Sequence, residues 1–206
     1  FLFLTSPRRK AAILHEPLLM DSYKWEKTSS ENGPHIKLFQ VRYDWMCNPR
    51  NGAEERMVIL EGRDSANVVA LTSDNQMLLI RQFRFGIGAD TLELPGGLME
   101  AGEELQDAAA RELIEETGYS SENWEYLGKV PSNPVFMDSY IHHWVARDVQ
   151  YSQAPALDDG EAVALVFLPI EKVLDMLLAG EFEHPHTVTA LLRFFVGTGL
   201  LISGRK

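Results

Sequence analysis

Strand-like and helix-like segments are interleaved along this chain, and this interleaving limits the possible fold more than any other feature of the sequence. Short runs of apolar residues predict strands at 68–71, 77–80, 124–130, 140–147 and 162–168. Apolar residues at three- and four-residue intervals predict helices at 104–117, 170–179 and 187–196. Helix C-caps are expected at Gly118, Gly180 and Gly197. A domain that mixes both kinds of element belongs to the α/β (α+β) class.

The front part of the chain predicts a separate and smaller antiparallel β unit. Residues alternate between two faces along 36–45, and a second strand is predicted at 56–60 after the Asn51-Gly52 turn. A unit of this size is too small to be stable alone. The expected organisation is an N-terminal extension at 1–34, a small β unit at 35–62 and a main domain at 63–206.

Charge and cysteine content exclude several kinds of partner. The 206 residues carry a net charge of −11, which argues against a nucleic acid polymer because its backbone requires a basic surface. A small phosphorylated ligand remains compatible, since a metal ion and a few arginines can outweigh the general field locally. No apolar stretch is long enough to span a membrane. The single cysteine, Cys47, cannot form an internal disulfide, which fits a cytoplasmic location.

Three carboxylates gather near the end of the helix predicted at 104–117. Glu112, Glu115 and Glu116 fall on one helical face, where they repel one another and also face the negative end of the helix dipole. Only Arg111 is placed to compensate, toward Glu115. A divalent cation such as Mg²⁺, which prefers oxygen ligands, would resolve the conflict. The alternative is a solvated acidic face without a ligand.

The spacing of these glutamates with their glycines and arginine favours the metal site. The segment Gly97–Tyr119 resembles the Nudix box, G-x5-E-x7-R-E-U-x-E-E-x-G-U, where U is a bulky aliphatic residue. Every fixed position matches except the last, where Tyr119 is aromatic. A motif with this many fixed positions is far more specific than a short glycine pattern. The resemblance implies a Nudix-type α/β/α sandwich with a mixed sheet.

The same resemblance implies roles for individual residues. Mg²⁺, or Mn²⁺, would be held by Glu112 and Glu116, helped by Glu115 and by the backbone carbonyl of Gly96. Arg111 would orient the glutamates by salt bridges, and Glu103 would join the same network. The metal would polarise the pyrophosphate and generate the attacking hydroxide from water.

Outside the box, residues 36–196 look similar to the ADP-ribose pyrophosphatase branch of the Nudix hydrolases. Pro134 stands at the position of the marker proline of that branch, and the segments 81–84 and 92–95 also look similar. The acidic loop 158–161 implies that Glu161 is a further metal ligand or the general base, a role that Glu115 could also fill. The β unit at 35–62 resembles the appendage through which such enzymes form homodimers.

The expected substrate-binding residues are Arg84, Arg81, Glu93 and Pro134. A guanidinium can donate two parallel hydrogen bonds to a diphosphate. Because Arg81 and Arg84 fall on opposite faces of a strand, only one is expected to face the ligand, and we favour Arg84. The chain departs from the branch at Gly96, where alanine is common, and at Val135–Asp138, so the pocket wall could differ.

Two histidine pairs raise the question of zinc. His142 and His143 are adjacent on a predicted strand and should point to opposite faces, so they are poorly placed to bind one ion. His184 and His186 lie in a predicted loop without further obvious ligands. No zinc site is expected.

Three functions remain open from the sequence. The first is hydrolysis of the pyrophosphate bond of a nucleoside diphosphate sugar, with ADP-ribose giving AMP and ribose 5-phosphate. The second is removal of oxidised nucleoside triphosphates, for which the front β unit would be superfluous. The third is a non-catalytic Nudix-fold binding module, which would be expected to lose glutamates that this box retains.

Overall fold

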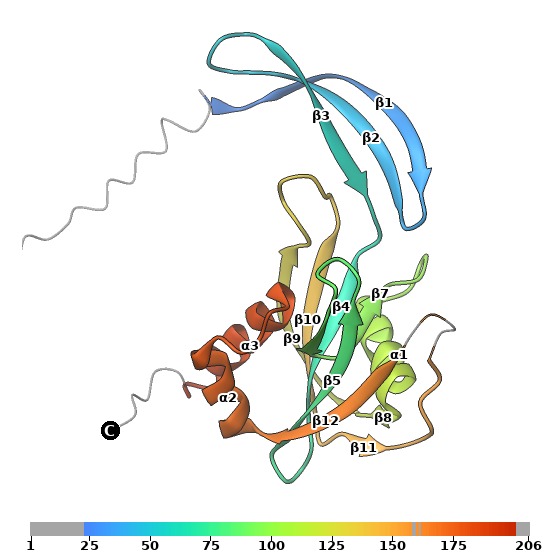
Figure 1. Cartoon of the computed structure of the whole chain (residues 1–206), viewed down its shortest axis with the longest axis vertical. Helices are drawn as coiled ribbons and strands as arrows, with labels where there is room; N and C mark the ends of the chain where they lie inside the picture. The colour runs from blue at the N-terminus through green and yellow to red at the C-terminus, as the bar shows by residue number, and fades with distance from the viewer. Residues whose placement is uncertain (1–22, 158–159, 161, 201–206) are drawn as a thin grey trace, which may run out of the picture.

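The computed structural model describes residues 23–157, 160 and 162–200. A mixed sheet lies between helix α1 on one face and helices α2 and α3 on the other (Figure 1). The helices are α1 (Leu105–Thr117), α2 (Ile170–Ala179) and α3 (Pro185–Gly197). The strands of this sheet are β4 (Ser65–Leu71), β5 (Gln76–Arg84), β6 (Ala89–Glu93), β7 (Gly96–Leu98), β9 (Asn123–Pro131), β10 (Tyr140–Arg147) and β12 (Val163–Pro169). The short strands β8 (Tyr119–Ser120) and β11 (Gln150–Tyr151) pair separately.

Strand β4 lies at the centre of the sheet and explains its mixed character. The strand order is β12-β5-β4-β10-β9, with β6 paired to β5 and β7 paired to β4. Strands β4 and β10 are parallel, whereas β4 pairs with β5 and β7 in the antiparallel sense. Successive side chains of β4 alternate between the layers, so Val68 packs toward α1 and Val69 packs toward α2 and α3. The α/β/α sandwich is therefore confirmed.

Most predicted boundaries of the main domain agree with the structure to within a few residues, and two glycine caps are confirmed. Gly118 and Gly180 adopt left-handed φ values of 77° and 75° at the ends of α1 and α2. The cap predicted at Gly197 is wrong, because Gly197 is the last residue of α3 and Thr198 is the cap. Thr198 keeps a right-handed conformation, which needs no glycine. No helix in residues 23–157 and 162–200 is long and apolar enough to cross a membrane.

The front β unit is a three-stranded antiparallel sheet that projects from the main domain (Figure 1). Its strands are β1 (Glu26–Ile36), β2 (Phe39–Cys47) and β3 (Glu54–Glu61). The unit begins before the expected residue 35, because β1 is polar and almost wholly exposed and so lacks an alternating apolar pattern. It attaches to the loop after β9: Leu60 N donates to Phe136 O at 2.7 Å, and Gly62 N donates to Asp138 Oδ1 at 3.2 Å.

Candidate active site

A cleft of about 530 Å³ lies against the acidic face of α1. Its walls come from the glycine segment of β7, the end of β5, helix α1 and the front β unit. Its charged lining residues are Glu100, Glu112, Glu115 and Glu116 together with Lys37, Arg63, Arg84 and Arg111. The cleft therefore combines oxygen donors suited to a cation with cationic groups suited to phosphate.

The glycine segment brings the backbone of β7 against the carboxylate of Glu116. The Gly96 N–H donates a hydrogen bond to Glu116 Oε2 at 2.7 Å, and Glu116 is only 3% exposed. Gly96 has a φ of 151°, and a Cβ there would lie 2.1 Å from the carbonyl oxygen of Ala66 on β4. Only glycine allows this close pairing of β7 with β4.

The neighbouring glycine makes room for the second carboxylate. A Cβ at Gly97 would lie 2.6 Å from Glu112 Oε2 and 2.7 Å from its carboxyl carbon. Without a side chain at Gly97, the Glu112 carboxylate packs directly on the β7 backbone. The two glycines thus hold both expected metal ligands against one short strand.

Arg111 is the centre of a hydrogen-bonded network with the surrounding carboxylates. Its Nε and Nη2 donate to the two oxygens of Glu103 at 2.9 and 3.0 Å, and its Nη1 donates to Glu112 and Glu115, each at 2.9 Å. Its Nη2 also donates to the carbonyl of Leu98 at 3.0 Å. The hydrogen bonds that Arg111 donates to Glu103 raise the pKa of Arg111 and lower the pKa of Glu103. Arg111 is therefore a fixed cation that holds three carboxylates in place.

The donor set of the cleft fits a hard divalent cation. Glu112, Glu115 and Glu116 all line the cleft and offer oxygen atoms, which Mg²⁺ and Mn²⁺ prefer. No group of three acidic, histidine or cysteine side chains is gathered closely enough to coordinate a metal among the described residues. In the structure Glu112 and Glu115 accept hydrogen bonds from Arg111, and Glu116 accepts the Gly96 N–H. Glu161 lies outside the described residues.

Arg84 lies on the cleft wall together with Gln82, whereas Arg81 is exposed and does not line the cleft. The carboxylate of Glu93 receives two hydrogen bonds from Arg84, at 2.7 and 2.6 Å, and one from Thr91. Glu93 is 1% exposed; burial alone would raise its pKa, but these hydrogen bonds hold the pKa below the usual value. Glu93 is thus placed to orient Arg84.

Other residues differ from the sequence expectations in their position. Pro134 is exposed in the loop after β9 and does not line the cleft. Lys37, Leu38 and Arg63 do line it, and sequence reasoning missed them. Lys37 occupies the turn between β1 and β2 with a φ of 47°, and the turn could not be recognised without the unpredicted strand β1.

The resemblance to the Nudix class implied an α/β/α sandwich. The structure has this architecture, and the glycine segment of β7 packs on the acidic face of α1 beside the cleft. The model of the NUDIX domain matches residues 62–191. The chain is 32% identical to a methanol dehydrogenase activator of Bacillus methanolicus, over 68% of this chain and 77% of the relative. It is 28% identical to an ADP-ribose pyrophosphatase of Mycobacterium tuberculosis, over 84% of each chain.

A solved structure supports the same assignment. The crystal structure of an ADP compounds hydrolase superposes with a TM-score of 0.74 and 25% identity, over 85% of this chain and 96% of that one. The chain belongs to the Nudix family.

Proposed function

We propose that this protein hydrolyses the pyrophosphate bond of a nucleoside diphosphate sugar, with ADP-ribose as substrate and AMP and ribose 5-phosphate as products. The observation that carries the proposal is the shared cleft, which is lined both by the acidic face of α1 and by Arg84. Relatives from Bacillus subtilis and Mycobacterium tuberculosis are named ADP-ribose pyrophosphatases, and the structural relative is named an ADP compounds hydrolase.

Mg²⁺ is the proposed cofactor, with Mn²⁺ as a substitute. Glu112 and Glu116 would hold the ion, assisted by Glu115 and by the carbonyl of Gly96. When bound, such an ion supplies Lewis-acid polarisation of a phosphoryl oxygen and a hydroxide nucleophile at neutral pH. Arg111, paired with Glu103, holds the metal-binding carboxylates in position by hydrogen bonds, and Arg84 binds the diphosphate. We propose Glu115 or Glu161 as the general base.

The assay that tests this function compares substrate classes. Purified protein with MgCl₂ is given ADP-ribose, other ADP-sugars and oxidised nucleoside triphosphates, and the products are identified by chromatography and mass spectrometry. We expect ADP-ribose to have the highest kcat/KM, to yield AMP and ribose 5-phosphate, and to be inert with excess EDTA. Preference for an oxidised triphosphate would favour the sanitising function, and absence of turnover on every substrate would favour a binding module.

We also propose that the β1–β3 unit is a dimerisation appendage. Among the apolar side chains of residues 26–61, all of which the structure describes, Val41 alone is buried, with 7% of its surface exposed, while Ile36, Leu38 and Val58 are between 45% and 50% exposed. A three-stranded sheet with so little core gains stability from a second surface. We expect light scattering of the full chain to give the mass of a homodimer, and a monomer at micromolar concentration would contradict this role. We also propose a cytoplasmic location for the protein.

A further inference from the structure

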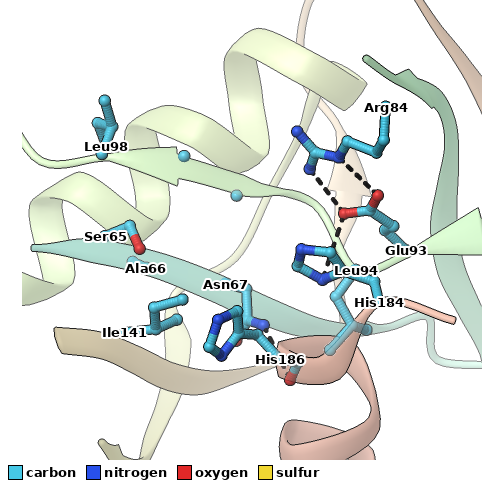
Figure 2. Close-up of a pocket in the computed structure, with 12 residues that line it drawn as sticks. Ser65, Ala66, Asn67, Arg84, Glu93, Leu94, Leu98, Ile141, His184 and His186 are labelled. Carbon is cyan, nitrogen blue, oxygen red and sulfur yellow. Dashed lines mark hydrogen bonds and ion pairs between the residues drawn. The ribbon is translucent and has the colours of Figure 1, made fainter. Parts of the chain in front are cut away.

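A second and smaller cavity, of about 190 Å³, opens beside the cleft at the start of α3 (Figure 2). It shares four lining residues with the cleft, namely Arg84, Gly96, Gly97 and Leu98. Arg84 thus lies at the border of both spaces, so a ligand phosphate bound to Arg84 would be next to this cavity. The volume is below the roughly 300–1,000 Å³ of a pocket for a whole drug-sized ligand, so it suits only part of a nucleotide.

One wall of the cavity includes Asn67 and His186, which hydrogen bonds connect to each other and to the buried His143 of β10. His143 Nδ1 donates to Asn67 Oδ1 at 2.7 Å, and Asn67 Nδ2 donates to the carbonyl oxygen of His186 at 3.4 Å. His143 is fully buried, and burial lowers its pKa to about 4, so the ring is neutral at physiological pH. These hydrogen bonds connect the Asn67 amide to β10 and to the first turn of α3, and Figure 2 draws the one between Asn67 and His186.

The opposite wall carries a buried carboxylate beside a second histidine. His184 Nδ1 lies 3.4 Å from Glu93 Oε2, and Glu93 is in turn paired with Arg84 (Figure 2). Burial lowers the pKa of His184 and of His186, so both rings are neutral at pH 7 and each can donate and accept a hydrogen bond. A second anionic group is disfavoured here by Glu93, whereas a neutral polar group is not.

The remaining walls favour a sugar over a nucleobase. Ile141 and Leu94 offer apolar contacts for C–H groups, while Ser65 and the two histidines offer partners for hydroxyls. Within the described residues that line the cavity, none is Phe, Tyr or Trp, the side chains on which a base stacks most favourably. A sugar ring carries both hydroxyl and C–H groups, so it can use the polar and the apolar walls of the cavity at the same time.

We propose that this cavity, lined by Asn67, His184, His186 and Ile141, is the sugar subsite and that its size selects a pentose over a hexose. The inference rests on the proposed function, because it assigns a place to the sugar half of the same substrate. His184 and His186 bind the sugar hydroxyls, Ile141 limits the size of the ring, and Arg84 holds the adjoining phosphate.

The first test measures product binding to the unmodified protein. Ribose 5-phosphate and AMP are titrated separately while the histidine ring signals are followed by NMR, with assignments from His184→Gln and His186→Gln. We expect ribose 5-phosphate to shift both rings and AMP to leave them unchanged. The reverse result would place the nucleobase in the cavity and overturn the proposal, as would the absence of a shift with either product.

The second test alters the walls. We expect His186→Ala to raise the Kd of ribose 5-phosphate about tenfold, the change expected when one or two hydrogen bonds to a ligand are lost, without changing that of AMP. We expect Ile141→Ala to raise the kcat/KM ratio of ADP-glucose to ADP-ribose roughly tenfold. Leu192→Ala, at an exposed position of the same helix, is the control and should change neither quantity.

Different results would contradict the proposed function and the sugar subsite. If the unmodified protein does not hydrolyse ADP-ribose, the proposed function is wrong. If it does, but His186→Ala leaves ribose 5-phosphate binding unchanged and Ile141→Ala leaves the ratio unchanged, only the sugar subsite is wrong. Circular dichroism of each variant shows whether it is folded, and the NMR titration stands without any variant that fails to fold.

Discussion

Glu116→Gln is expected to reduce kcat for ADP-ribose by at least about 100-fold, since even residues that only support a metal ligand contribute 10- to 100-fold. The variant should keep its fold. Glu116 is buried, but its Oε2 accepts the Gly96 N–H, and the glutamine carbonyl oxygen can accept the same hydrogen bond. What the variant loses is one negative charge and one oxygen donor in the cleft. Steady-state kinetics with varied MgCl₂ measures the loss.

The control for this variant is Asp107→Asn, which makes the same change of carboxylate to amide at an exposed position in the first turn of α1. It should retain near-normal kcat. Thermal unfolding of both variants should resemble that of the unmodified protein. Near-normal turnover of Glu116→Gln would show that the metal assignment is wrong, whatever the substrate.

For the acidic helix α1, the sequence predicted the bounds of the helix better than the contacts of its side chains. Its periodicity and Gly118 placed the helix to within a residue, because these signals depend only on neighbours along the chain. Helical spacing predicted a contact of Arg111 with Glu115 alone, whereas the family resemblance also implied salt bridges to the other glutamates and a place for Glu103 in the network. The structure shows Arg111 bonded to Glu103, from the preceding loop, and to Glu112 at the adjacent position. A long side chain can bend back to both, and helical spacing alone does not reveal such contacts.

The sequence suggested that a metal ion is needed to offset the repulsion between the crowded carboxylates, but the structure shows that a metal ion is not the only compensation. The hydrogen bonds of Arg111 already neutralise part of the repulsion. The oxygen donors of the cleft and the membership of the chain in the Nudix family still favour a bound cation.

The rest of the site depends on contacts between segments that are distant in the sequence. Lys37 lies in the β1–β2 turn and Arg63 in the connection from β3 to β4, and the fold brings both to the cleft beside the acidic helix. The small cavity joins β4, β10 and the start of α3, so the histidines of a predicted loop become a wall beside Arg84. The requirement for glycine at Gly97 likewise comes from Glu112, which the fold brings against it.

Arg111→Lys is expected to lower both stability and activity, although the positive charge is kept. Arg111 donates to Glu103 through two parallel hydrogen bonds and also to Glu112, Glu115 and the Leu98 carbonyl. A lysine ammonium has only three donors and no planar fork, so it cannot satisfy this set. The loss of two charge-assisted hydrogen bonds of a partly exposed side chain, at about 1.5 kcal/mol each, predicts a decrease of about 3 kcal/mol in the free energy of unfolding. Urea denaturation at pH 7 measures this decrease.

The pH dependence separates the network from general damage to the fold. Arg111 lowers the pKa of Glu103 in the folded protein, so this contribution to stability is present above the ordinary glutamate pKa and is lost as the pH falls through the lowered value. The difference in stability between Arg111→Lys and the unmodified protein should therefore shrink as the pH falls from 7 to below 4. Arg147→Lys is the control, because its partner Glu125 is exposed and such a pair contributes at most about 1 kcal/mol. A stability difference for Arg111→Lys that stays constant with pH would contradict the role given to this network.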